Sequence, residues 1–173
     1  MTIKTIITEP NEILRQVSKP VPAVGNEERK LMDDMLETMY AANGIGLAAI
    51  QIGIPKRIIV MDISKDGKKN PMYFVNPTIK NKDKEKTTYE EGCLSVPNYF
   101  AEVDRPKYCE VEYLDYNGEN KILEADGLLA TCIQHEMDHL EGILFIDYLS
   151  KLKKTMIVKK LSKRKNPPDR IIV

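Results

Sequence analysis

The segment GLLATCIQHEMDHL, residues 127–140, decides how this chain folds and what it can bind. Before His135 the segment is apolar nearly all round, which predicts a buried helix, and Gly142 is suited to ending that helix. The segment holds both histidines of the chain, His135 and His139. Residues i and i+4 of a helix lie on one face, so the two imidazoles can bind one metal ion. Glu136 lies beside them and completes the HExxH pattern of two nitrogen ligands and a nearby carboxylate.

Strand patterns precede this helix. Residues 57–63 read as a buried strand, and residues 72–80 read as a second strand that Pro77 breaks. Residues 107–115 and 119–125 flank Asn117-Gly118, a strong signal for a hairpin turn. We therefore expect antiparallel strand pairs.

Two further helices are expected, one near each end of the chain. Asn26 can cap a helix that runs to about residue 43 and carries a Met-rich apolar stripe. Ser150 can cap a basic helix over about residues 150–165, which a tail of residues 166–173 follows.

These elements predict an α+β fold in which antiparallel β-sheets pack around a central buried helix carrying HExxH, with an N-terminal helix and a C-terminal helix. A length of 173 residues, with 42% hydrophobic and 30% charged residues, fits one domain with a sizeable core. We therefore expect residues 1–173 to form a single domain.

The cellular location is expected to be cytoplasmic. The first twenty residues contain no apolar run long enough for a signal peptide, and runs such as residues 58–61 are too short to span a bilayer, so we expect no membrane contact. The three cysteines, Cys93, Cys109 and Cys132, are an odd number without a framework spacing, which argues against a disulfide scaffold.

Charge is distributed unevenly although the net charge is zero. Residues 151–173 carry nine Lys or Arg residues and one acid, a local charge of +8, and the preceding residues carry −8. This asymmetry indicates an acidic body with a basic terminal element.

A catalytic site of the HExxH type needs a third protein ligand and one open position. The metzincin pattern would place a third histidine at Phe145, so that class of protease is excluded. Asp147 is a weak candidate and would give a zincin-like metallopeptidase. Cys93 is the better candidate, because a thiolate is a strong ligand for a borderline or soft divalent metal. A structural metal site without catalysis is a further alternative.

Three segments together resemble peptide deformylases of the bacterial type I. The family motifs GxGxAAxQ, EGCLS and QHExDHL stand here, in the family's order, at residues 44–51, 91–95 and 134–140. The ordered triplet is very specific, and the resemblance covers nearly the whole chain. Several family members carry a basic residue shortly after EGCLS, where this chain has the uncharged Asn98, Tyr99 and Phe100, so the resemblance does not extend to the outer substrate contacts.

The resemblance implies a metal-dependent hydrolase that removes the N-formyl group from the formyl-methionine of newly synthesised peptides and releases formate. Cys93, His135 and His139 would hold the metal. Glu136 would accept the proton of the attacking water and return it to the leaving nitrogen. The Leu94 backbone N–H and the Gln51 amide would stabilise the oxyanion.

The resemblance also implies supporting residues. An ion pair between Glu91 and Arg105 would brace the cysteine segment. An apolar pocket and backbone positions that align the peptide as an added strand would bind the methionine, and we assign them to Ile45, Gly46, Gly92, Leu128, Thr131 and Cys132.

Cofactor and partners follow from the same resemblance. It implies one divalent metal ion per chain, Fe²⁺ in the cell, with Zn²⁺, Ni²⁺ or Co²⁺ in purified protein. The expected partners are N-formyl-methionyl nascent peptides and ribosomal RNA, the latter contacted by the basic C-terminal helix. We expect a monomer.

Overall fold

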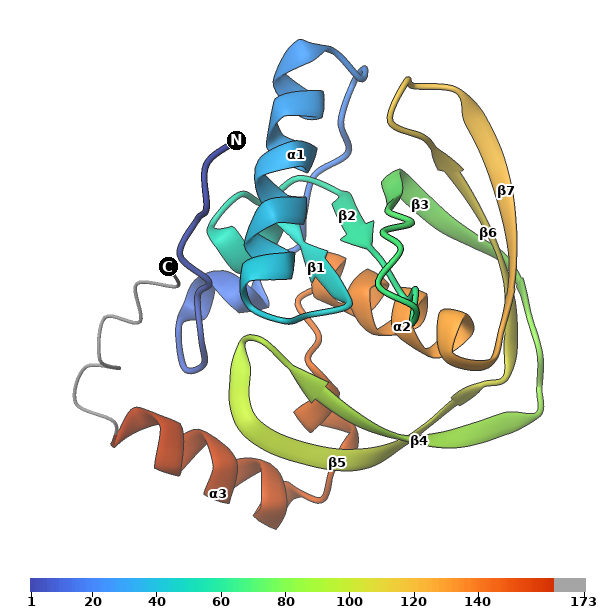
Figure 1. The fold of residues 1–173 in the computed structure, drawn as a ribbon. Helices are drawn as coiled ribbons and strands as arrows, with labels where there is room; N and C mark the ends of the chain where they lie inside the picture. Colours follow the sequence, from blue (N-terminus) through green and yellow to red (C-terminus); the bar gives the residue numbers. More distant parts are fainter. Residues whose placement is uncertain (164–173) are drawn as a thin grey trace.

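The central element of the fold is α2 (Gly127–Leu140), as Figure 1 shows for the computed structural model, which describes residues 1–163. Most of this helix is buried, including both histidines. Gly142 follows it with φ +72°, in the left-handed region that favours glycine. A Cβ at Gly142 would collide with the Arg15 carbonyl oxygen, so this close approach also requires glycine. The predicted buried HExxH helix is confirmed.

A five-stranded antiparallel sheet packs against α2. Its strand order is β1-β2-β3-β6-β7, and the predicted turn at Asn117-Gly118 joins β6 to β7. The expected break at Pro77 is wrong: β3 continues through it, and only the pairing with β6 shifts register between Val75 and Thr78. A proline can be accommodated at such an irregularity because one ladder hydrogen bond is already missing there. The strands are β1 (Gly46–Ala48), β2 (Ile58–Met61), β3 (Met72–Lys82), β6 (Tyr108–Leu114) and β7 (Asn120–Asp126).

A separate two-stranded hairpin lies against α2 and was not predicted from the sequence. It consists of β4 (Lys86–Cys93) and β5 (Val96–Pro106), and it runs below α2 in the view of Figure 1. Its tight end carries Cys93 and Leu94. The hairpin therefore delivers the cysteine segment to the helix that carries the histidines.

The N-terminal helix α1 (Asn26–Ala41) packs its methionine-rich face on β1 and β2. The predicted cap is one residue off, because Gly25 holds the N-cap position and its N–H donates to the Glu28 carboxylate at 3.0 Å. Asn43, with φ +56°, turns the chain after the helix ends.

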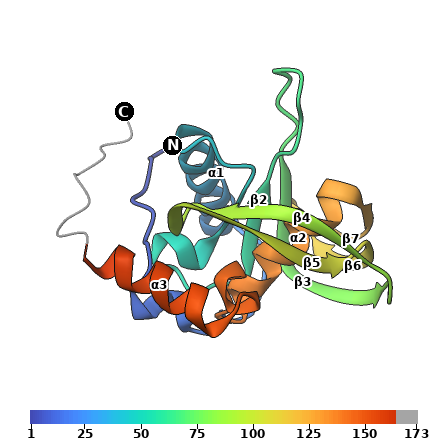
Figure 2. The same ribbon diagram turned by 90° about the horizontal axis from the view of Figure 1, so that it is seen from below.

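The C-terminal helix α3 (Lys151–Ser162) begins as predicted, with the Ser150 hydroxyl accepting the Lys153 N–H. Ile157 and Leu161 pack into a core cluster with the short helix η3 (Phe145–Tyr148) and the short helix η1 (Glu12–Arg15). Figure 2 shows α3 at the side of the molecule away from β6 and β7. The expected tail, residues 166–173, lies outside the described residues.

The α+β fold class is confirmed by these layers. Within residues 1–163, none of the helices combines the length and apolarity needed to cross a membrane.

Candidate metal centre

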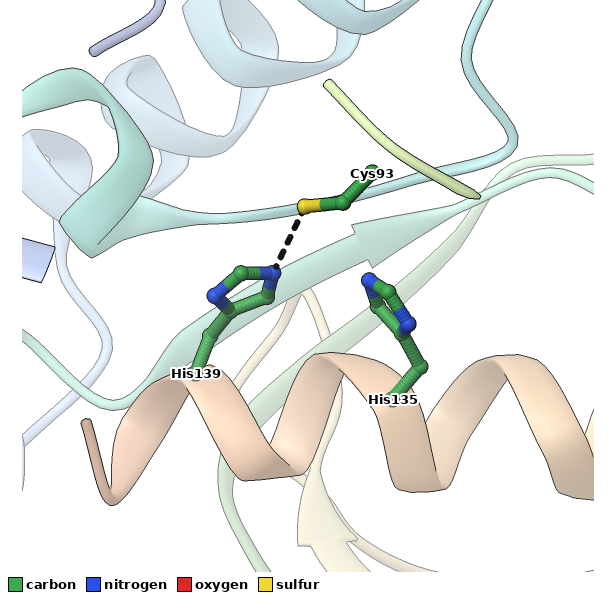
Figure 3. A group of neighbouring side chains, drawn as sticks. All are labelled: Cys93, His135 and His139. Carbon is green, nitrogen blue, oxygen red and sulfur yellow. Dashed lines mark hydrogen bonds between the residues drawn. The ribbon is translucent and has the colours of Figure 1, made fainter. Parts of the chain in front are cut away.

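Three potential metal ligands meet between the β4–β5 hairpin and α2. Cys93 comes from the end of β4, and His135 and His139 come from one face of α2 (Figure 3). One ligand atom from each side chain lies within 4.8 Å of the others, and Cys93 Sγ is 3.3 Å from His139 Nε2. Donor atoms that share one ion at about 2.0–2.3 Å have spacings of this order. One thiolate and two imidazoles also suit a borderline divalent ion, so the residues fit such a metal.

Glu136 provides a buried acid beside these ligands. It is only 4% exposed, and its Oε2 has no hydrogen-bond partner among the described residues. Burial is the largest influence on this carboxyl and raises its pKa to about 7. A carboxyl group with that pKa can both take up and release a proton near neutral pH.

The orientation of His135 is fixed from behind by Glu91. The Glu91 carboxylate accepts a hydrogen bond from His135 Nδ1 at 2.8 Å, which leaves Nε2 as the nitrogen available to a metal. Arg105 donates to both oxygens of Glu91, at 2.6 and 2.9 Å. Burial raises the Glu91 pKa, but the hydrogen bonds from His135 and Arg105 outweigh it, and the pKa lies below its usual range. Glu91 is therefore a carboxylate that holds the imidazole in one tautomer.

Asp138 is a member of this network that the sequence analysis missed. Its carboxylate accepts a hydrogen bond from Arg105 Nη1 at 2.8 Å. It lies three residues after His135, so helix periodicity places it close to the same face. That spacing was the signal available in the sequence.

A cavity of about 510 Å³ opens onto Cys93, His135 and Glu136. Gln51 points its Nε2 into this region, 3.0 Å from Ser95 Oγ and 3.6 Å from Cys93 Sγ, while its Oε1 accepts the Ala48 N–H. Leu94 also lines the cavity. The six residues assigned to substrate binding all lie on its wall: Ile45, Gly46, Gly92, Leu128, Thr131 and Cys132.

Phe100 is an exposed aromatic residue of the cavity wall. It is 69% exposed, and it packs so closely on Gly92 that a Cβ at position 92 would lie 2.6 Å from the ring.

Asp147, the alternative third ligand, does not lie beside the histidines. Its carboxylate forms ion pairs with Arg15 and Lys154, each at 2.6 Å.

Comparison with known proteins identifies the family. The model of the polypeptide deformylase family matches residues 3–155. The chain belongs to the polypeptide deformylase family. It is therefore an enzyme of a metal-dependent hydrolase family, as the sequence motifs indicated.

Individual relatives agree with this family membership. The chain is 74% identical over 174 residues, all of both chains, to the peptide deformylase of Pelagibacter ubique (strain HTCC1062). It is 56% identical to that of Rhizobium meliloti (strain 1021), over 94% of each chain.

Two solved structures of the family superimpose closely. The peptide deformylase of Ehrlichia chaffeensis in complex with actinonin matches with a TM-score of 0.92 and 44% identity, over 96% of this chain and 99% of that one. The Met-Ala-Ser-bound class I type b enzyme of Acinetobacter baumannii matches with a TM-score of 0.81 and 34% identity, over 86% and 99% of the chains.

Proposed function

We propose that this enzyme hydrolyses the formamide of N-formyl-methionyl nascent peptides, releasing formate and a free N-terminal amine. The observation that carries the proposal is the convergence of Cys93, His135 and His139 beside the buried Glu136, whose Oε2 has no hydrogen-bond partner among residues 1–163. Cys93, His135 and Glu136 line one cavity. The Met-Ala-Ser tripeptide bound to the Acinetobacter relative is the product expected of such a reaction. A cavity of about 510 Å³ is large enough for a peptide N-terminus.

Cys93, His135 and His139 would hold one divalent ion, Fe²⁺ in the cell. Zn²⁺, Ni²⁺ or Co²⁺ are compatible with the same donors. The ion would act as a Lewis acid that polarises the formyl oxygen and acidifies water. The thiolate supplies one negative charge and the imidazoles none, so the site retains a net positive charge toward the developing oxyanion.

Protein groups perform the remaining steps. Glu136 takes the proton of the attacking water and then gives it to the departing nitrogen. Gln51 Nε2 and the Leu94 N–H donate hydrogen bonds to the oxygen on which charge develops. The hydrogen bond from the Ala48 N–H to Gln51 Oε1 holds the amide with its NH₂ group toward Cys93.

Substrate binding is assigned to the cavity wall. Ile45, Leu128, Thr131 and Cys132 would enclose the methionine side chain, while the backbone at Gly46 and Gly92 would pair with the peptide as an added strand. The ion pair between Glu91 and Arg105 braces the cysteine segment and His135.

Formate release from formyl-Met-Ala-Ser under anaerobic conditions tests the proposal, with iron-loaded and zinc-loaded enzyme compared. Glu136→Ala is expected to abolish turnover and to retain stoichiometric metal. Unchanged turnover in that variant would contradict the mechanism.

A second pair of variants distinguishes the zincin-like alternative. Cys93→Ser is expected to lose metal and activity, whereas Asp147→Asn keeps both, because Asp147 is engaged by Arg15 and Lys154. The opposite pattern would favour a His135, His139 and Asp147 site. Retained metal without turnover in the wild-type enzyme would indicate a structural site.

We also propose that α3 docks on ribosomal RNA and that residues 1–173 act as one monomeric cytoplasmic domain. Exposed lysines on α3 support the docking proposal, together with the +8 charge of residues 151–173. Four of the charged residues in that segment, Arg164, Lys165, Asp169 and Arg170, lie outside the described residues. Deleting α3 would remove Ile157 and Leu161 and uncover the core residues they pack against, among them Leu14, Phe145 and Ile146, so charge reversal at Lys153 and Lys160 is the cleaner test. Ribosome co-sedimentation should then fall, and binding unaffected by the reversal would contradict docking. Light scattering tests the monomer.

A further inference from the structure

The support of His135 continues beyond Glu91 and Arg105 to the protein surface. Arg105 Nη1 and the Tyr148 hydroxyl both donate to the same oxygen of Asp138, at 2.8 and 2.7 Å. The chain of contacts therefore runs from His135 through Glu91, Arg105 and Asp138 to Tyr148 without a gap. The first member is a proposed metal ligand, and the last is half exposed.

Tyr148 also covers the face of the guanidinium. The Arg105 carbon Cζ lies 4.9 Å from the centre of the Tyr148 ring, a cation–π geometry. Arg105 is only 3% exposed, although it borders a cleft of about 770 Å³ on the side of Tyr148, Asp138 and Gln134. The ring is thus part of what separates this buried cation from the solvent of that cleft. Removing the cover would hydrate Arg105 and weaken its hold on Glu91.

The position of Tyr148 is itself constrained. The preceding residue, Asp147, forms ion pairs with Arg15 in η1 and with Lys154 in α3. These ion pairs link η3 to both of those helices. Burial and the Asp138 carboxylate raise the pKa of the Tyr148 hydroxyl to about 12, so the hydroxyl remains a hydrogen-bond donor at physiological pH. A fixed donor of this kind can hold Asp138 in one rotamer.

We propose that Tyr148 is a positioning residue that acts on His135 through Asp138, Arg105 and Glu91, and so sets the geometry and lifetime of the bound metal. Partners behind a metal-binding histidine commonly change metal affinity or activity by about 10–100-fold when removed. Tyr148 lies further out, so we expect about a 3- to 10-fold effect. The inference rests on the proposed role of His135 as a metal ligand.

The test uses the Co²⁺-substituted enzyme, whose absorption reports the geometry around the metal and its thiolate ligand. Tyr148→Phe removes the hydroxyl alone, and Tyr148→Leu also removes the ring. Tyr108→Phe and Tyr108→Leu are matched controls, because the Tyr108 hydroxyl donates to Glu124 outside this network. We expect altered visible bands and about 3- to 10-fold faster metal release to a chelator in Tyr148→Leu, a smaller change in Tyr148→Phe, and none in the controls.

Formate release and a double-mutant cycle complete the test. The kcat of Tyr148→Leu should fall with KM unchanged, and Tyr148→Phe combined with Asp138→Asn should be less than additive, because both act through one network. The inference would be overturned if the Tyr148 variants matched the Tyr108 controls in their spectra and metal release and differed only in a lower Tm. Tyr148 would then serve only to cover the surface. A wild-type Co²⁺ enzyme without thiolate charge-transfer bands would instead overturn the proposed metal site.

Discussion

Gly46 lies directly against the side chain of Glu136. A Cβ at position 46 would come within 2.5 Å of Glu136 Oε1 and 2.9 Å of its Cδ. The backbone of β1 therefore forms one wall of the space in which the proposed proton carrier sits, and any larger residue would compete with that carboxyl group for it.

Gly46→Ala is expected to displace the Glu136 carboxyl and to lower kcat by at least about 100-fold, since a misplaced general base loses most of its contribution. Metal content should remain stoichiometric. Formate release and metal analysis measure the two effects. Gly25→Ala is the control, because its Cβ would meet nothing nearer than 3.4 Å. Equal activity of Gly46→Ala and wild type would show that Glu136 has room elsewhere.

Glu91→Gln should weaken the metal site without changing its ligands. The amide is uncharged, so the hydrogen bond to His135 Nδ1 loses charge assistance and the buried Arg105 loses one of its two counterions. We expect metal to be released about 10-fold faster to a chelator. The comparison variant is Glu112→Gln, which breaks an exposed pair with Lys80. Similar release rates for both variants would contradict the support role.

The central helix and the strands β2, β6 and β7 could be predicted because their apolar periodicity is strong. The hairpin that carries Cys93 could not, because β4 reads as lysine, threonine and glutamate and most of its residues before Glu91 remain exposed or half-exposed. A strand that lies at the surface has no apolar alternation to reveal it. Thr87, Thr88 and Tyr89 were the β-formers available as a weak signal.

The metal ligands could be predicted from the residue types available and from the motifs around them. With only two histidines, the chain had to supply its third ligand from another residue type, and the motif around Cys93 supplied one. Helical spacing could have placed Asp138 near His135, but its link to Arg105 and Tyr148 was inaccessible, because these contacts arise only through tertiary packing between η3, α2 and β5. No spacing in the sequence encodes that packing.

The Asp62 carboxylate should contribute its full stabilisation only above about pH 4. Burial raises its pKa, but hydrogen bonds from Ser64, Tyr40 and the Asn70 N–H outweigh burial and bring it to about 2. A pKa lowered on folding stabilises the protein above the unfolded value of 3.8, and this contribution disappears as the pH falls toward 2. Urea unfolding should show wild type about 1–2 kcal/mol more stable than Asp62→Asn at pH 6, with roughly a third of that difference left at pH 2.5. A stability difference between the two proteins that does not change with pH would contradict this role of the Asp62 carboxylate.

Removing the metal should loosen the β4–β5 hairpin first. The ion would join Cys93 on the hairpin to the two histidines on α2, so its loss removes a link between these elements. A ligand present at about 100 times its Kd stabilises by about 2.7 kcal/mol, which corresponds to roughly 5–10 °C in Tm for a chain of this size. Hydrogen exchange should rise in residues 86–106 after chelation and stay unchanged in α1. Equal changes in both segments would mean that the metal stabilises the fold globally.

Phe100 should affect substrate binding and not the chemical step. Its ring lines the cavity, packs on Gly92 and keeps 69% of its surface exposed, so a peptide passing the cysteine segment can bury part of it. Burying about 40 Å² of apolar surface contributes on the order of 1 kcal/mol. Phe100→Ala is therefore expected to raise KM for formyl-Met-Ala-Ser about 5-fold at constant kcat, since a contact made equally in the ground and transition states changes KM alone. Phe100→Leu keeps an apolar contact and should retain most of the affinity. A fall in kcat in Phe100→Ala would place the ring in the positioning of Cys93 instead, because Gly92 directly precedes that ligand.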